Sequence, residues 1–195
     1  MRSAQLPNLA TGATIEHIKR TDPSERVHMT TIIEVDRSRR LRWTGQRVRC
    51  ALGRNGIIAA KSEGDGGTPT GVMPLRQVFY RADRLDPPNT PLPLARLEPD
   101  DGWCDDPADY AYNTHVKLPY PASCEELWRD DHIYDVIVVL GYNDDPVVAG
   151  RGSAIFLHVA RSNFKPTEGC VALVLEDLLS LLGSLSGEAA IRVEG

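Results

Sequence analysis

Two residues near the carboxyl end of the chain, His158 and Cys170, have the types and spacing of a catalytic base and its nucleophile. The segment HVARSNFKPTEGC (158–170) places the histidine at the end of an apolar run and the cysteine after a polar loop. A cysteine attacks as its thiolate, and because a free thiol titrates at about pH 8.5 it needs a base at neutral pH. Gly169 permits a sharp turn, so that the amides of Gly169 and Cys170 can bind an oxyanion. The pattern fits cysteine acyl transfer, but taken alone it leaves a purely structural role open.

The remaining candidates for chemistry are weaker. Cys50, Cys104 and Cys124 form no Cys-x-x-Cys pair, and no His-Glu-x-x-His occurs, so we expect small buried thiols and no metal ion. The glycine-rich segment GDGGTPTG (64–71) lacks the Gly-Lys-Ser/Thr ending of a phosphate loop, and a strand-like run follows it. We interpret this segment as a turn between strands and expect no organic cofactor.

The elements that must position His158 and Cys170 are predicted to be strands. The run at 133–142 is the most apolar and predicts a central strand that is buried on both faces. Glu176 and Asp177 are typical of the first turn of a short helix. Alternating or β-branched runs predict further strands at 30–35, 41–43, 47–52, 72–80, 153–160 and 188–195.

Two connections are also predicted. Gly53-Arg54-Asn55-Gly56 is typical of a tight turn, which would pair the preceding strand with residues 57–60 as a hairpin. Residues 83–125 are rich in Pro, Asp and Tyr without clear periodicity, which indicates a long connection. The predicted fold class is therefore mainly β with short helices, as a β-sandwich or a partly open barrel.

Composition limits the function classes. The chain has 195 residues, of which 42% are hydrophobic and 25% charged, and this predicts one globular domain at 29–195 after a polar N-terminal arm at 1–28. The formal net charge of -5 argues against a nucleic-acid partner. No run reaches the length of a membrane-spanning helix, so membrane insertion is not expected. The arm lacks the apolar core of a secretory signal, which predicts a cytoplasmic protein.

Three segments together resemble the L,D-transpeptidase (YkuD-type) catalytic domain family. GSAIFLHVAR (152–161) followed by PTEGCVAL (166–173) is similar to its catalytic segment, a histidine, a loop and then Ser/Thr-His-Gly-Cys. KSEGDGGTPTGVMPL (61–75) resembles its Thr-Pro-x-Gly strand and turn, and DHIYDVIVVLGYND (131–144) resembles its preceding core strand. The resemblance extends over about residues 30–195 in the family's order.

The resemblance implies an L,D-transpeptidase-type β-sandwich with Cys170 as nucleophile, His158 as base and the backbone around Gly169 as oxyanion hole. Thr167 falls on the family's Ser/Thr, but Glu168 stands where the family has histidine, and Ala172 where it has Asn or Arg. These departures leave the assignment of the nucleophile unchanged, but they affect which substrate is expected to bind, because the resemblance implies that these side chains line the acyl pocket. The expected substrate-binding residues are Thr167 and Glu168, with Arg161, Tyr142 and Asn143 from their positions beside the core strands; for Arg161 an ordinary exposed role is the alternative.

The family's activity implies peptidoglycan stem peptides or muropeptides as partners, and carbapenem-type inhibitors as covalent labels. Cys170 would attack the bond between the L-centre of a diamino acid and terminal D-alanine, forming a thioester. Transfer to water would make the protein an L,D-carboxypeptidase that trims tetrapeptides to tripeptides in cytoplasmic murein recycling, which the expected location favours. The alternatives are an L,D-transpeptidase that cross-links peptidoglycan in the cell envelope, and a non-catalytic stem-peptide-binding module. Retention of both His158 and Cys170 argues against the last.

Overall fold

The computed structural model describes residues 31–195, so the predicted arm at 1–28 lies outside the described residues. Within them, no helix is long and apolar enough to span a membrane. The elements are β1 (Thr31–Asp36), β2 (Arg40–Trp43), β3 (Gln46–Arg49), β4 (Ile57–Ile58), β5 (Thr68–Pro69), β6 (Gly71–Tyr80), β7 (Leu94–Arg96), β8 (Asp101–Cys104), β9 (His115–Lys117), β10 (Cys124–Glu126), β11 (Val136–Leu140), β12 (Phe156–Val159), the 3-10 helix η1 (Ser162–Phe164), β13 (Val171–Leu173), α1 (Leu175–Ser184) and β14 (Ala189–Val193).

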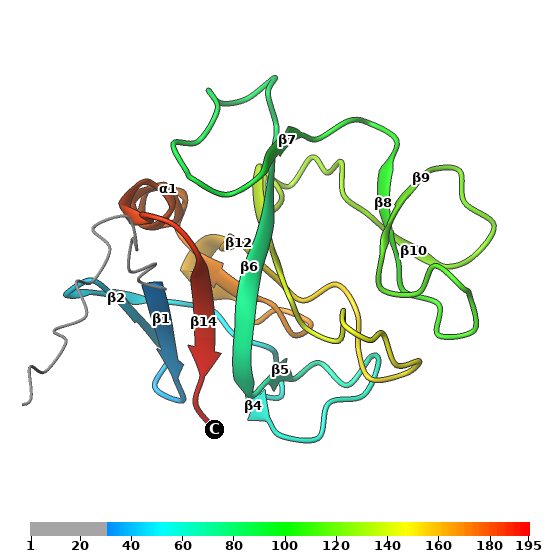
Figure 1. Cartoon of the computed structure of the whole chain (residues 1–195), viewed down its shortest axis with the longest axis horizontal. Helices are drawn as coiled ribbons and strands as arrows, with labels where there is room; N and C mark the ends of the chain where they lie inside the picture. Colours follow the sequence, from blue (N-terminus) through cyan, green and yellow to red (C-terminus); the bar gives the residue numbers. More distant parts are fainter. Residues whose placement is uncertain (1–30) are drawn as a thin grey trace, which may run out of the picture.

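One large sheet organises the molecule (Figure 1). Its strands run in the order β13-β12-β11-β6-β14-β1-β2-β3, with β7 paired to β6. Isolated bridges join Ala51 to Ala172 and Gly53 to Thr167, so the chain after β3 reaches back to β13. The two ends of the sheet therefore meet, and the sheet is nearly closed like a barrel. The predicted mainly β fold class is confirmed.

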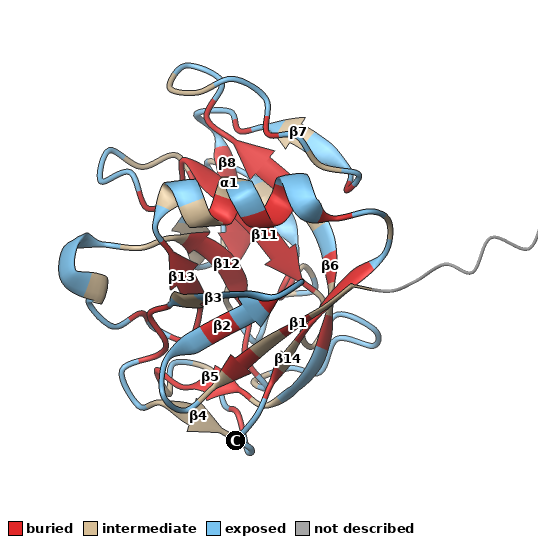
Figure 2. Ribbon diagram, turned by 90° about the vertical axis from the view of Figure 1, so that its left-hand side faces the viewer, coloured by how far each residue is buried: buried red, intermediate tan, exposed pale blue. Residues whose placement is uncertain are grey.

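The core lies where apolar strands are buried on both faces. Every residue of β11, VIVVL, is buried, as predicted for a central strand, and β-branched side chains suit this packing. Leu178, Leu181 and Leu182 place the apolar stripe of α1 against the core, while its outer face is exposed (Figure 2). Glu176 and Asp177 lie in the first turn of α1, as the sequence predicted.

Two predicted connections were wrong. Residues 83–125 contain β7 and a separate three-stranded sheet in the order β10-β8-β9. Residues 54–55 do form a turn, but the following β4 pairs in parallel with β5 instead of folding back as a hairpin. In both cases the partner strand is distant in the sequence or very short, so local periodicity does not reveal the pairing.

The small sheet packs against the large one through an aromatic cluster. The Trp103 ring from β8 meets the Phe156 ring from β12 edge-on, with centroids 5.1 Å apart. Tyr134 packs edge-on against the same Phe156 ring at 6.1 Å. Cys170 packs in the same buried cluster as these aromatic rings, so the predicted nucleophile lies where the two sheets join.

Candidate active site

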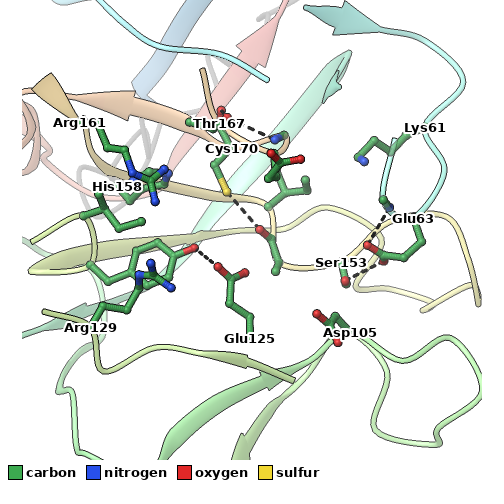
Figure 3. A pocket seen from close by; sticks show the side chains of 17 residues that line it. Lys61, Glu63, Asp105, Glu125, Arg129, Ser153, His158, Arg161, Thr167 and Cys170 are labelled. Atoms are coloured by element: carbon green, nitrogen blue, oxygen red, sulfur yellow. Dashed lines mark hydrogen bonds between the residues drawn. The ribbon is translucent and has the colours of Figure 1, made fainter. Parts of the chain in front are cut away.

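Cys170 is placed by the parallel pair β12–β13. Leu157 is paired with Val171, which puts Cys170 alongside Phe156 at the start of β13. The Phe156 amide donates to Cys170 Sγ at 3.3 Å, and the thiol donates to the Ala154 carbonyl at 3.2 Å (Figure 3). The thiol is buried and held by backbone on both sides, so its position is set by the strands.

The turn before Cys170 is braced by Thr167. Its buried hydroxyl donates to the Cys170 carbonyl at 2.6 Å and accepts from the Gly169 amide at 3.2 Å. Gly169 has φ +146, and a Cβ there would lie 3.0 Å from the Gly67 carbonyl oxygen. Only glycine fits this conformation and this close approach. The Gly169 amide, predicted as an oxyanion donor, is engaged by Thr167 in this state.

The glycine-rich segment 64–71 therefore packs against the turn that precedes Cys170. Gly67 contacts Gly169, as above, and Thr68 Oγ1 accepts from the Gly53 amide at 2.8 Å. The Arg54 amide in turn donates to the Thr167 carbonyl at 2.8 Å. The segment 64–71, which the sequence predicted to be a turn between strands, thus contacts the turn that carries Gly169 and Cys170.

His158 lies on β12 two residues beyond Phe156, and therefore on the same face of the sheet as Cys170. Its Nδ1 is 2.9 Å from the Val159 carbonyl oxygen. A carbonyl can only accept, so in the neutral ring Nδ1 carries the hydrogen and Nε2 keeps the lone pair of a base. The Tyr134 ring packs edge-on to the imidazole at 5.3 Å and fixes its orientation.

Burial keeps both groups uncharged in the free protein. It lowers the pKa of His158 to about 4 and raises the pKa of Cys170 to about 12, with the Glu125 carboxylate adding to the latter. No hydrogen bond joins the thiol to the imidazole among residues 31–195. The resting pair is therefore a neutral thiol and a neutral imidazole.

Cys170 and His158 open on a single pocket of about 370 Å³ (Figure 3). Both signs of charge line its walls, which suits a zwitterionic ligand. The acidic lining residues are Glu63, Asp105, Glu125 and Glu168, and the basic ones are Lys61, Arg129 and Arg161.

Glu125 and Tyr134 form a hydrogen-bonded pair inside this pocket. The Tyr134 hydroxyl donates to Glu125 Oε1 at 2.5 Å. Burial raises the pKa of Glu125, and the Tyr134 bond and Arg129 counteract that rise. Sequence reasoning missed Glu125 because it lies in the region interpreted as a connection, where a carboxylate is expected to face solvent.

Lys61 and Glu63 line the opposite side of the pocket. Lys61 is buried, and its Nζ donates to Asp65 Oδ1 at 2.6 Å and to the Ser62 carbonyl at 3.0 Å. Glu63 Oε2 accepts from the hydroxyls of Tyr112 at 2.5 Å and Ser153 at 2.7 Å. Lys61 and Glu63 had a single signal in the sequence, their position in the segment at 61–75 that resembles the family.

The other predicted site residues separate into two groups. Arg161, Thr167 and Glu168 line the pocket, where Arg161 donates to Asp131 at 3.2 Å and exposed Glu168 forms an ion pair with Arg54. Tyr142 and Asn143 are not among the lining residues.

Tyr142 and Asn143 stabilise the loop after β11 by hydrogen bonds to its backbone. The Tyr142 hydroxyl donates to the Arg151 carbonyl at 2.8 Å. The Asn143 amide donates to the carbonyls of Val148 at 3.0 Å and Gly152 at 2.9 Å. The structure thus brings Cys170, His158, Gly169, Thr167, Glu168 and Arg161 together around one pocket, and places these two side chains in the supporting loop.

Comparison with known proteins identifies the family. The profile of the YkuD family, described as the L,D-transpeptidase catalytic domain, matches residues 30–190. A solved L,D-transpeptidase (Yku) from Stackebrandtia nassauensis is 12% identical with a TM-score of 0.39, over 91% of this chain and 62% of that one. An L,D-transpeptidase from Mycobacterium smegmatis is 12% identical with a TM-score of 0.41, over 85% of this chain and 59% of that one.

This chain thus spans about three fifths of the length of these two solved structures. No curated protein matches it significantly. The family match covers most of the chain, including both His158 and Cys170. The protein therefore belongs to the family of L,D-transpeptidase (YkuD) catalytic domains.

Proposed function

We propose that the protein is a cysteine acyl-transfer enzyme that acts on peptidoglycan stem peptides, and that water is its main acyl acceptor. It would then be an L,D-carboxypeptidase of cytoplasmic murein recycling, converting a tetrapeptide to a tripeptide and D-alanine. The observation that carries the proposal is the placement of Cys170 and His158 on adjacent parallel strands around one pocket, in a chain of this family.

In the first half-reaction, His158 Nε2 takes the thiol proton as Sγ attacks the carbonyl of the diamino acid L-centre. Collapse of the tetrahedral intermediate breaks the C–N bond, and the imidazolium gives its proton to the departing D-alanine amine. The thioester on Cys170 remains. A base that is neutral above about pH 4 is ready for this step at neutral pH.

Two arguments support water as the acceptor. The four acidic lining residues outnumber the three basic ones, which favours the protonated form of an acceptor amine, and an ammonium group is not a nucleophile. In the proposed cytoplasmic location, recycled stem peptides are soluble fragments and no neighbouring peptidoglycan strand supplies an acceptor. Hydrolysis needs neither an amine nor a second peptide.

The test is incubation of the purified protein with muropeptide tetrapeptides, followed by mass spectrometry of the products. We expect tripeptide and D-alanine, with cross-linked dimer as a minor product, and no product with Cys170→Ala. Cys50→Ala serves as the matched control, because Cys50 is buried outside the pocket.

Dimer as the main product, or an exported protein in cell fractionation, would establish the transpeptidase alternative. Binding of the tetrapeptide without any product would establish the non-catalytic module. Each of these results rejects the proposed hydrolysis.

A further inference from the structure

Cys104 and Cys124 lie directly opposite each other on β8 and β10. Two neighbouring hydrogen bonds show which kind of pair they form: the Asp105 amide donates to the Ser123 carbonyl at 3.1 Å, and the Leu127 amide donates to the Asp101 carbonyl at 3.0 Å. Because hydrogen-bonded and non-hydrogen-bonded pairs alternate in an antiparallel ladder, Cys104 and Cys124 occupy a non-hydrogen-bonded position.

This position satisfies the distance requirement of a disulfide. The Cα atoms of a non-hydrogen-bonded pair lie about 4.5 Å apart, within the range that a disulfide spans. Both cysteines are free thiols in this structure. The Cys124 thiol donates to the Ala122 carbonyl at 3.5 Å, and nearby Cys104 contributes to the raised pKa of Cys124. Two cysteines paired at such a position need little backbone movement to form a bond.

A small oxidant can reach one of the two sulfurs. Cys104 is fully buried, but Cys124 is partly exposed. Cys124 also lines a surface cavity of about 580 Å³, together with Pro119 and Trp128, which is separate from the pocket of Cys170. The geometry therefore makes Cys124 the attacking thiol and Cys104 the resolving thiol.

We propose that Cys104 and Cys124 form a disulfide across β8 and β10 when the protein meets a small disulfide oxidant of the oxidised-glutathione class. The Cys124 thiolate attacks one sulfur of the oxidant, forming a mixed disulfide and releasing one thiolate. The Cys104 thiol then loses its proton and attacks the Cys124 sulfur, which expels the second small thiolate. The protein loses two hydrogen atoms, and the oxidant is reduced to two thiols.

Burial raises the pKa of Cys124 to about 11, so few molecules hold the thiolate near neutral pH. The rate of disulfide formation is therefore expected to rise about tenfold per pH unit below that pKa. A reducing cytoplasm keeps both thiols free, whereas an oxidising envelope closes the bond. The redox state of this pair in cells therefore reports the compartment in which the protein resides.

The bond has a consequence for the catalytic pocket. Asp105 follows Cys104 and Glu125 follows Cys124, and both side chains line the pocket of Cys170. A covalent link between β8 and β10 fixes the two segments that carry these carboxylates. It also closes the intervening loop in the unfolded chain, which stabilises the folded state.

The experiment uses the full chain with Cys170→Ala, so that the nucleophile does not react. The folded protein is incubated with oxidised glutathione at several pH values above neutrality, then alkylated and mapped by peptide mass spectrometry. We expect one cross-linked peptide pair joining Cys104 to Cys124, a higher urea midpoint than in the reduced protein, and Cys50 as a free thiol.

Cys124→Ser in the same background is expected to lose both the cross-link and the oxidant-dependent rise of the urea midpoint. Cys50→Ala is expected to retain both. The proposal is overturned if Cys104 and Cys124 stay alkylatable after treatment at about pH 9, if glutathione remains on Cys124 without resolution, or if another pair of cysteines is joined.

Discussion

At Cys170, the hydrogen of the thiol points to the Ala154 carbonyl and not to His158. The imidazole is in turn anchored through Nδ1 to the Val159 carbonyl. Both groups are buried and neutral, so the free protein holds no thiolate-imidazolium pair. In the proposed mechanism, the thiol proton must therefore turn from the Ala154 carbonyl to Nε2 of His158 during attack.

The first prediction concerns these two side chains. Cys170→Ala and Cys170→Ser are expected to abolish turnover while leaving the fold intact, because neither variant supplies a thiolate. His158→Gln is expected to slow acylation at least about a hundredfold, the usual scale for loss of a general base. Intact mass spectrometry of the acyl-enzyme measures both effects, with a carbapenem as a second probe of Cys170. Wild-type turnover in either Cys170 variant would show that the nucleophile is misassigned.

The second prediction concerns Glu125, whose carboxylate contributes to the raised pKa of Cys170. The rate of Cys170 alkylation by iodoacetamide should increase with pH throughout the range to about pH 10, because a thiol with a pKa of about 12 does not reach a plateau there. Glu125→Gln removes a negative charge and should lower that pKa, giving faster alkylation at each pH. Glu126→Gln, on the exposed side of β10, is the matched control. An unchanged rate in Glu125→Gln would contradict the electrostatic coupling.

Among the elements, those formed from long apolar runs were predictable, and short ones were not. β11 and β12 follow from local composition, whereas β7, β9 and β10 have three residues each, too few to show a period. Their existence depends on partners that the fold brings from elsewhere. The same reason applies to the pocket: Cys170 and His158 were predicted from local sequence, while Glu125 and Lys61 reach the pocket through tertiary packing.

The third prediction concerns the turn between β12 and β13. Gly169→Ala places a Cβ 3.0 Å from the Gly67 oxygen at a φ of +146. Backbone strain of this kind lowers the free energy of unfolding by about 1–3 kcal/mol, and relief of the strain must move the neighbouring Cys170. We expect a lower urea midpoint together with loss of acylation. Gly150→Ala has positive φ but open space around the Cβ, so it should lower stability and leave acylation near that of the wild type. Equal acylation in both variants would reject a positioning role for Gly169.

For the whole molecule, buried His158 links stability to pH. Its pKa is about 4 in the folded state against an ordinary value of 6.5, so between these values the unfolded chain binds more protons. Stability is therefore complete above about pH 6.5 and falls as the pH falls toward 4. This single group should remove about 2 kcal/mol of unfolding free energy between about pH 7 and about pH 5.

The fourth prediction follows from this linkage. Urea denaturation at both pH values should show a smaller loss of unfolding free energy in His158→Gln than in the wild type, because glutamine does not titrate. His132→Gln is the comparison variant, since it removes an imidazole that is 69% exposed and that contacts Asp135. An equal loss in the His158 variant and the wild type would mean that the imidazole is already protonated, or is solvated, in the folded state.

The parallel pairing of β1 with β14 has a consequence for how the molecule is made. β1 lies at the start of the described chain, but its partner comes from residues 189–193, and β14 also separates β1 from β6 (Figure 1). During synthesis β1 can complete this pairing only after β14 has left the ribosome. Sheets that depend on such distant contacts fold slowly. Chains that stop before β14 leave the facing edges of β1 and β6 unpaired, and such edges can pair with other chains.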